Sequence, residues 1–282
     1  MCDQDHFEED LKKYSRRDIG TLAAAGLGAA MMLPRVANAA EVSEQDVEIE
    51  TPDGKCDAYF VSPSTGSHVA VLIWPDIFGL RPAFRQMGKR LAESGYSVLV
   101  VNPFYRQQKA PTAANGANTS ISDVRPLARS LTPETHTTDA KAFVAWLDKQ
   151  SQVDTDKPIG TTGYCMGGPI VFRTAAAVPD RVGAAATFHG GGLVSDGEDS
   201  PHLLIPKMKA DFLIAIAEND DQRDAEAKSV LKESFAEANL DAEIEVYPAG
   251  HGWCPPDTRV HNPEQAEKAW SRMLALFESA LA

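Results

Sequence analysis

The feature that most constrains the fold of this 282-residue chain is an alternation of short apolar segments with longer amphipathic ones after residue 40. Segments such as 69–74 and 212–217 are apolar throughout, which is typical of strands buried on both faces. The segments between them repeat apolar residues with helical spacing. Because strands that alternate with helices lie parallel in one sheet, we expect an α/β fold: a mostly parallel sheet with helices on both faces.

The expected elements follow from these patterns. We predict strands at residues 46–50, 56–61, 69–74, 97–102, 158–163, 182–188, 212–217 and 242–247. We predict helices at residues 82–94, 134–150, 166–177, 224–238 and 263–280. Residues 107–133 fit neither pattern, and a connection of that length is usually functional or mobile. We interpret it as a lid over the site.

Charge and cysteine content exclude several classes of function. The net charge of −13 argues against nucleic-acid binding and against an anionic membrane surface, since both need a basic face. The four cysteines form no CxxC pair, so neither zinc-ligand spacing nor a redox dithiol is present. No metal and no organic cofactor is implied. Whether Cys56 and Cys254 form a disulfide is left open.

Residues 1–39 have the pattern of an export signal. Arg16 and Arg17 precede a short apolar run that ends at Leu33, and Ala37-Asn38-Ala39 supplies a small-x-small cleavage site. The run is too short for a transmembrane anchor, and its glycines disfavour an ordinary helix. Paired arginines in this position resemble a twin-arginine signal. We therefore expect twin-arginine export machinery as a partner, a periplasmic or secreted location, and a single domain at residues 40–282.

Cys165 stands in the most informative motif. Gly163-Tyr164-Cys165-Met166-Gly167 lies between a predicted strand and a predicted helix, which is the context of a nucleophile elbow with Cys in place of Ser. The helix dipole favours a thiolate there, and the Met166 N–H can bind an oxyanion. The alternative is a buried structural cysteine in a glycine-rich turn.

Two later residues favour the catalytic interpretation. Asp220 follows the predicted strand 212–217, and His251 follows the strand that ends at residue 247. Nucleophile, acid and histidine thus occur in the chain order of α/β-hydrolases, each beyond a strand's carboxyl end. We predict Cys165 as nucleophile, His251 as base and Asp220 as its orienting partner. Glu218 or Asp221 could replace Asp220, which is also suited to a helix N-cap.

The other histidines carry weaker signals. His189 follows the predicted strand 182–188 within Phe188-His189-Gly190-Gly191-Gly192, so we expect it to line the site without acting as the base. We expect the remaining ones to be surface or loop residues: His68, His136, His202 and His261.

Four motifs resemble the dienelactone hydrolase (carboxymethylenebutenolidase) family, and the resemblance runs from about residue 45 to the C-terminus. They are Trp74-Pro75-Asp76-Ile77-Phe78-Gly79, Asn102-Pro103-Phe104-Tyr105-Arg106, Gly163-Tyr164-Cys165-Met166-Gly167-Gly168 and Ala249-Gly250-His251-Gly252-Trp253. The resemblance implies Cys165, Asp220 and His251 as the triad. It also implies an oxyanion hole formed by the N–H groups of Ile77 and Met166.

The resemblance extends to substrate-binding residues, with two departures. Arg106 matches an arginine that binds a substrate carboxylate, and Tyr105 and Trp253 lie in the matching motifs as further substrate-binding candidates. Asp76 occupies the place of an acidic residue, usually Glu, that takes the thiol proton, and it is one methylene shorter. A second arginine expected four residues after the histidine is replaced by Pro255.

We therefore expect a carboxylic ester hydrolase that cleaves a small-molecule lactone or activated ester through an acyl-enzyme on Cys165. A thiolate is itself a good leaving group, so after its attack on an unactivated ester the intermediate tends to revert. Substrates whose own leaving group departs as a stabilised enolate are therefore favoured. The alternatives are a general carboxylesterase or thioesterase of the same family, and a non-catalytic binding protein on the same scaffold.

Overall fold

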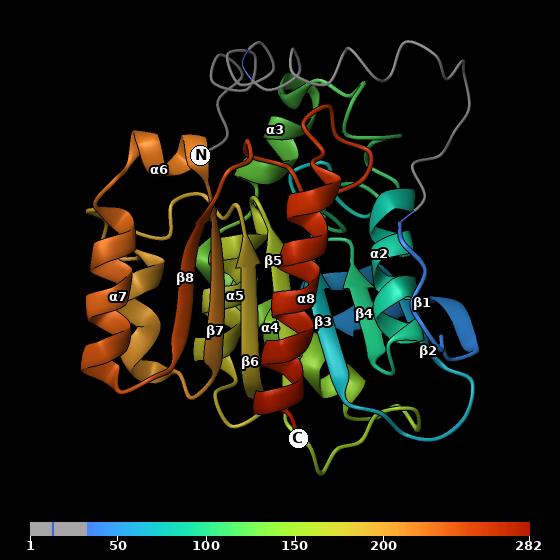
Figure 1. Ribbon diagram of the computed structural model, residues 1–282. Helices are drawn as coiled ribbons and strands as arrows, with labels where there is room; N and C mark the ends of the chain where they lie inside the picture. Colours follow the sequence, from blue (N-terminus) through green and yellow to red (C-terminus); the bar gives the residue numbers. More distant parts are fainter. Residues whose placement is uncertain (1–12, 14–32) are drawn as a thin grey trace.

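The strands of the computed structural model, which describes residue 13 and residues 33–282, form one eight-stranded sheet (Figure 1). The strands are β1 (Val42–Thr51), β2 (Gly54–Pro63), β3 (Ala70–Trp74), β4 (Ser97–Val101), β5 (Ile159–Tyr164), β6 (Val182–Phe188), β7 (Asp211–Ala217) and β8 (Ala242–Tyr247). Their order is β1-β2-β4-β3-β5-β6-β7-β8. β2 is antiparallel to its neighbours β1 and β4. The other neighbouring strands pair in parallel, in the order β4-β3-β5-β6-β7-β8. The predicted mostly parallel sheet is confirmed.

Two hydrophobic clusters lie on opposite faces of this sheet, because successive side chains of a strand point to opposite sides. Leu72 of β3 and Phe212 of β7 belong to the first cluster, and Val71 and Leu213 beside them belong to the second. Every residue of β3 and β4 is buried, as expected for central strands covered on both faces.

The helices cover these two faces. They are α2 (Pro82–Glu93), α4 (Pro133–Leu147), α5 (Gly167–Ala177), α7 (Ala227–Ala238) and α8 (Pro263–Ala280). α4, α5 and α7 contribute Phe143, Phe172 and Phe235 to the first cluster, whereas α2 and α8 contribute Phe84 and Phe277 to the second. In Figure 1, α8 crosses in front of the sheet, with α4 and α5 behind it.

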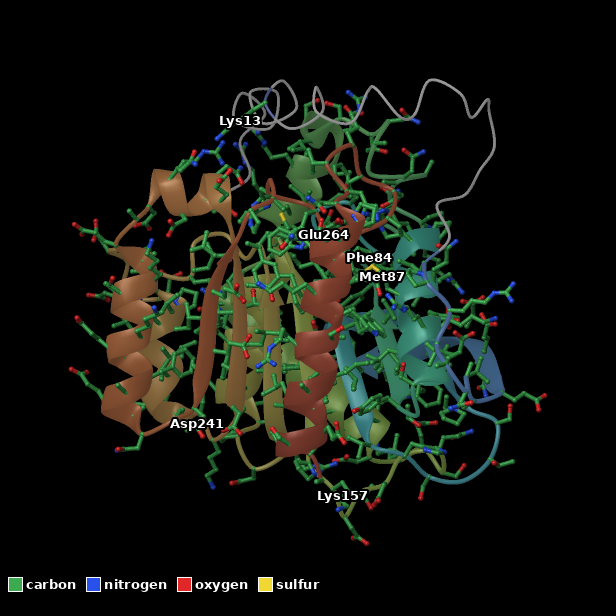
Figure 2. All side chains as sticks on the ribbon, in the orientation of Figure 1. Lys13, Phe84, Met87, Lys157, Asp241 and Glu264 are labelled. Carbon is green, nitrogen blue, oxygen red and sulfur yellow. The ribbon has the colours of Figure 1, made fainter. Side chains whose placement is uncertain are left out.

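The two ends of the sheet differ in what they carry. Glu264, in the first turn of α8, lies at the end where the parallel strands finish, and Asp241 lies at the opposite end just before β8 begins (Figure 2). The segments that follow β3, β5, β6, β7 and β8 therefore meet at the Glu264 end, where open α/β sheets bind ligands.

Three helical segments were not predicted. Residues 107–133, expected to be irregular, contain α3 (Ile121–Arg129). Its N-cap is Ser120, whose side chain accepts a hydrogen bond from Ser122 N. α6 (Glu218–Arg223) and a 3-10 helix, η1 (Pro201–Lys207), are the others. α6 reads Glu-Asn-Asp-Asp-Gln-Arg and has no apolar periodicity to detect. Its acidic residues favour the positive end of the helix dipole.

Most of the predicted export signal lies outside the described residues. The backbone N–H of Ala40 donates to Glu93 O at 3.0 Å, so the chain contacts the folded domain from this residue on. β1 begins at Val42. In residue 13 and residues 33–282, no helix is both long enough and apolar enough to cross a membrane.

Candidate active site

Cys165 lies on a strained turn between β5 and α5. Its φ of 53° is in the left-handed region, where a residue other than glycine costs conformational energy. The turn needs glycines on both sides, because a Cβ on Gly163 would lie 2.3 Å from Gly167 O and one on Gly167 would lie 2.4 Å from Trp74 O. The thiol-bearing residue is 4% exposed and lines a cavity of about 330 Å³. This is the geometry expected of a nucleophile elbow.

His251 and Asp220 form a hydrogen-bonded pair in the same cavity. His251 Nδ1 and Asp220 Oδ2 are 2.7 Å apart, and His251 N donates to Asn219 Oδ1 at 2.8 Å. A carboxylate at Nδ1 keeps the proton on that nitrogen, so that Nε2 is the atom able to act as a base. The alternative Asp221 binds Lys228 Nζ at 2.7 and 2.8 Å, so Asp220 is the better orienting partner.

The two predicted oxyanion residues come from neighbouring loops. Ile77 lines the cavity just beyond β3, in a turn closed by Gly79 N donating to Asp76 O at 2.9 Å. Met166 directly precedes α5, the helix that begins at Gly167. Backbone N–H groups at a helix start are suited to hold a developing negative charge.

Asp76 is held by an arginine that sequence reasoning missed. Arg81 donates to Asp76 Oδ1 at 2.6 Å and to Oδ2 at 3.0 Å, and its Nε donates to Asp257 Oδ2 at 2.7 Å. Its side chain is wholly buried, against the rings of Phe78 and Phe84. Burial raises the pKa of Asp76, and the Arg81 guanidinium opposes that shift. An arginine one residue before a helix gave no sequence signal of this role.

The cavity wall is mostly apolar. It includes the side chains of Ile77, Phe78, Leu193, Ile216, Leu231 and Val260. Among the described residues that line it, Arg223 is the one arginine or lysine, and its NH1 lies 3.6 Å from Asp220 Oδ1. The wall is thus suited to an apolar substrate group more than to a strongly anionic one.

The structure does not bring the three predicted substrate-binding residues to this wall. Arg106 binds Asp53 and Asp139 outside it, each at 2.6 Å from NH2. Tyr105 OH donates to Asp139 Oδ1 at 2.9 Å. Trp253 is fully buried and stacks on Tyr247, 5.3 Å between ring centroids. Arg106 and Tyr105 therefore form a polar cluster between the β1–β2 turn and α4, and Trp253 forms part of the hydrophobic core.

One histidine, His189, lies where it was predicted, and another, His136, does not. His189 lines the cavity, as expected, and is fully buried. His136 was expected at the surface or in a loop and instead lies in α4, mostly enclosed, where burial and the nearby Arg173 lower its pKa to about 3. The polar sequence around it concealed this, since Thr135, Thr137 and Thr138 flank it.

Cys56 and Cys254 are present as buried thiols and not as a disulfide. Cys56 belongs to the cluster on one face of the sheet and Cys254 to the cluster on the other. Burial raises the pKa of both thiols. No group of three or more His, Cys, Asp or Glu side chains in the described part of the chain is placed to hold a metal ion.

The segment predicted as a lid contributes to the site. Ile121 of α3 lines the cavity, and it packs with Val124, Ile77 and Phe78 in a small hydrophobic cluster. Gly116 N donates to Asp257 Oδ2 at 3.0 Å, which ties the segment to the Arg81 network. α3 therefore forms part of the cavity wall next to Ile77.

Comparison with known proteins assigns the chain to a family. The model of the dienelactone hydrolase family matches residues 56–281 of the chain. The chain belongs to the dienelactone hydrolase family. The match spans the elbow, Asp220, His251 and the strand-end motif at Asp76, so all of the candidate site lies within the family's domain.

Individual relatives support the family assignment. The chain is 30% identical over 227 residues to a carboxymethylenebutenolidase of Rhodococcus opacus, covering 78% of this chain and 84% of the relative. A dienelactone hydrolase-like promiscuous phosphotriesterase from metagenomic libraries superposes with a TM-score of 0.71 at 19% identity, covering 86% of this chain and 99% of the other. A dienelactone hydrolase from Anabaena variabilis superposes with a TM-score of 0.62 at 16% identity, covering 86% of this chain and 99% of the other. The two structural matches bear on the fold alone. As a member of the dienelactone hydrolase family, the chain is a hydrolase of the class that acts on esters and lactones.

Proposed function

We propose that this enzyme cleaves a lactone or activated ester through a thioester acyl-enzyme on Cys165. The observation that carries the proposal is the meeting, in one cavity, of an elbow cysteine with a histidine whose Nδ1 lies 2.7 Å from a carboxylate oxygen. An elbow at left-handed φ is costly to maintain and serves to expose a nucleophile.

The reaction proceeds in two halves. His251 Nε2 takes the Cys165 thiol proton, and the sulfur forms a bond to the substrate carbonyl carbon. The carbonyl oxygen becomes an oxyanion held by the N–H groups of Ile77 and Met166. Collapse breaks the ester C–O bond, and the leaving oxygen takes the proton from His251, either as it departs or afterwards as a stabilised enolate, so that His251 is neutral again. A water deprotonated by His251 then attacks the thioester, which releases the carboxylic acid and restores the thiol.

Asp76 adds a second route for the thiol proton. Its carboxylate lines the cavity with Cys165, and burial raises its pKa, which favours proton uptake. The bond from Arg81 opposes this uptake, so proton transfer to Asp76 requires a substrate that weakens the Asp76–Arg81 pair.

A second candidate substrate class is a neutral ester or thioester with an apolar acyl group. The apolar cavity wall favours it, as does the engagement of Arg106 by Asp53 and Asp139 away from that wall. A free carboxylate on the substrate would meet Arg223 in a cavity that Asp76, Asp220 and Asp224 also line, and these like charges reduce the attraction.

Hydrolysis of cis- and trans-dienelactone beside p-nitrophenyl acetate tests the proposal, with Cys165→Ala as the variant and Cys56→Ala as the control. We expect Cys165→Ala to lose turnover and Cys56→Ala to keep it. Lactone turnover favours an anionic lactone substrate, and turnover of p-nitrophenyl acetate alone favours a neutral ester. Equal activity of Cys165→Ala and the native enzyme would exclude the mechanism.

A further inference from the structure

The turn that follows β3 is capped by the side chain of an acidic residue. Asp76 Oδ1 accepts a hydrogen bond from Phe78 N at 2.9 Å, and Asp76 O accepts one from Gly79 N at 2.9 Å. An aspartate that binds the N–H two residues later stabilises a turn, and Gly79 ends this one at a left-handed φ of 72°. Residues 76–79 therefore form a turn that depends on the Asp76 carboxylate as well as on the backbone.

Other polar backbone groups of this turn are bound as well, and one N–H is left open. Thr112 Oγ1 donates to Phe78 O at 2.9 Å, and Arg81 NH1 donates to Gly79 O at 3.3 Å. The N–H of Ile77 has no acceptor among the described residues. Ile77 is 6% exposed and lines the cavity. Because enclosed N–H groups are normally paired, an open one at this wall is suited to an oxygen of a ligand.

The turn lies against the nucleophile elbow. A Cβ on Gly167 would lie 2.4 Å from Trp74 O and 3.0 Å from Pro75 O, the two residues that precede the turn. Met166 packs against the small hydrophobic cluster that contains Ile77. The two N–H groups of the proposed oxyanion hole therefore belong to segments in direct contact, so a change in the turn would change their relative position.

Arg81 holds the Asp76 carboxylate in the orientation that caps the turn. It donates to both carboxylate oxygens, at 2.6 and 3.0 Å, and Asp257 binds the same guanidinium from its other side. The bond from Phe78 N and the bonds from Arg81 all stabilise the charged form of Asp76, and so none of them promotes proton uptake. All of them are consistent with a carboxylate that is fixed in place.

We propose that Asp76 is a positioning residue for the oxyanion hole. Its side chain holds the 76–79 turn in the form that keeps the Ile77 N–H directed at the carbonyl oxygen of the substrate. The N–H binds this oxygen more strongly once it becomes an oxyanion, so the turn stabilises the transition state more than the bound substrate. This role is separate from uptake of the thiol proton by the same carboxylate. The inference rests on the proposed function of the cavity.

Two substitutions of Asp76 separate positioning from proton transfer. Asp76→Asn keeps an oxygen that can accept from Phe78 N but cannot take up the thiol proton, whereas Asp76→Ala loses both abilities. Arg81 keeps Asp257 as its counter-ion in either variant, so no buried cation is left unpaired.

A matched control comes from another turn of the same kind. Asp154 Oδ1 accepts from Asp156 N at 3.0 Å, outside the cavity, so Asp154→Ala removes an equivalent bond away from the site. Circular dichroism and thermal unfolding establish that each full-length variant is folded. If Asp76→Ala does not fold, Asp76→Ser replaces it, since a hydroxyl makes the same turn bond more weakly.

We expect kcat on the best of the lactone and p-nitrophenyl ester substrates to be about ten- to a hundredfold lower in Asp76→Ala than in Asp76→Asn, with KM within about threefold. Asp76→Ser should lie between the two. The inhibition constant of a trifluoromethyl ketone, whose adduct with Cys165 carries an oxyanion, should rise in the same proportion as kcat falls. Asp154→Ala should match the native enzyme in both measurements.

Equal kcat in folded Asp76→Asn and Asp76→Ala would overturn the inference, and so would a loss confined to KM. Cys165→Ala, assayed in parallel, separates this failure from failure of the proposed function. If that variant stays active, the cysteine mechanism fails; if it is inactive while Asp76→Ala matches Asp76→Asn, the Asp76 inference alone fails.

Discussion

At the scale of single residues, acidic side chains that are adjacent in the sequence make different contacts around the site. Asp220 Oδ2 lies 2.7 Å from His251 Nδ1, while the adjacent Asp221 binds Lys228. Asp76 is bound by Arg81, and Phe78 N donates to the same carboxylate at 2.9 Å. The motif order predicted Asp220 and left Glu218 and Asp221 open, because three acidic residues within four positions have the same pattern. Only the direction of each side chain within α6 separates them.

Asp220→Asn tests this assignment. The amide cannot accept from His251 Nδ1–H as a carboxylate does and favours the wrong tautomer, so we expect kcat/KM to fall at least about a hundredfold with little change in thermal stability. Asp221→Asn is the matched control and should stay within about threefold of the native enzyme in kcat/KM. Steady-state kinetics on purified protein decides between them. A larger loss in Asp221→Asn would reassign the orienting role.

At the scale of elements, the sequence predicted the strands well because burial on both faces requires apolar runs. β3, β6 and β7 lie within a residue of their expected ranges, and β8, a half-buried edge strand that alternates apolar and polar residues, matches its expected range. α3 and α6 were missed, since each is short and α6 has no apolar residue. The Arg81 network was missed for a different reason. It joins the start of α2 to Asp257 after β8, and a contact across 176 positions leaves no local pattern.

Removal of Arg81 tests how far that network fixes the loops around the cavity. Arg81→Leu leaves the buried Asp76 carboxylate without its counter-ion, which typically costs about 3–5 kcal/mol in free energy of unfolding. Arg85→Leu in α2, which removes the exposed pair with Asp46 of β1, should cost about 0–1 kcal/mol. Urea denaturation of both variants gives the comparison. Equal stabilities would mean that the Arg81 network contributes little to the fold.

At the scale of the whole molecule, the chain combines an acidic hydrolase domain with a predicted export signal. The net charge of −13 argues against nucleic-acid and anionic-membrane partners, which need a basic face. We propose that the enzyme works outside the cytoplasm. Support comes from Arg16-Arg17 and from Ala37-Asn38-Ala39, which ends three residues before β1 begins at Val42.

Replacement of Arg16 and Arg17 by lysine in a bacterial host tests export. Twin-arginine recognition requires the arginine pair, so we expect the Lys-Lys chain to accumulate in the cytoplasm with residues 1–39 still attached. The native chain should appear in the periplasm or medium, beginning at or near Ala40. Fractionation with intact-mass measurement gives both readouts, and an unchanged distribution of the Lys-Lys chain would contradict the proposal.

The measurement that bears most directly on the central claim is the rate of alkylation of each cysteine by iodoacetamide, followed by peptide mass spectrometry and by ester hydrolysis in the same samples. Cys56 and Cys254 serve as internal controls, since burial raises the pKa of both thiols. The account predicts that Cys165 reacts much faster than either and that hydrolysis is lost in proportion to its labelling. Hydrolysis that survives complete labelling of Cys165, or disappears while Cys165 is unmodified, would contradict it.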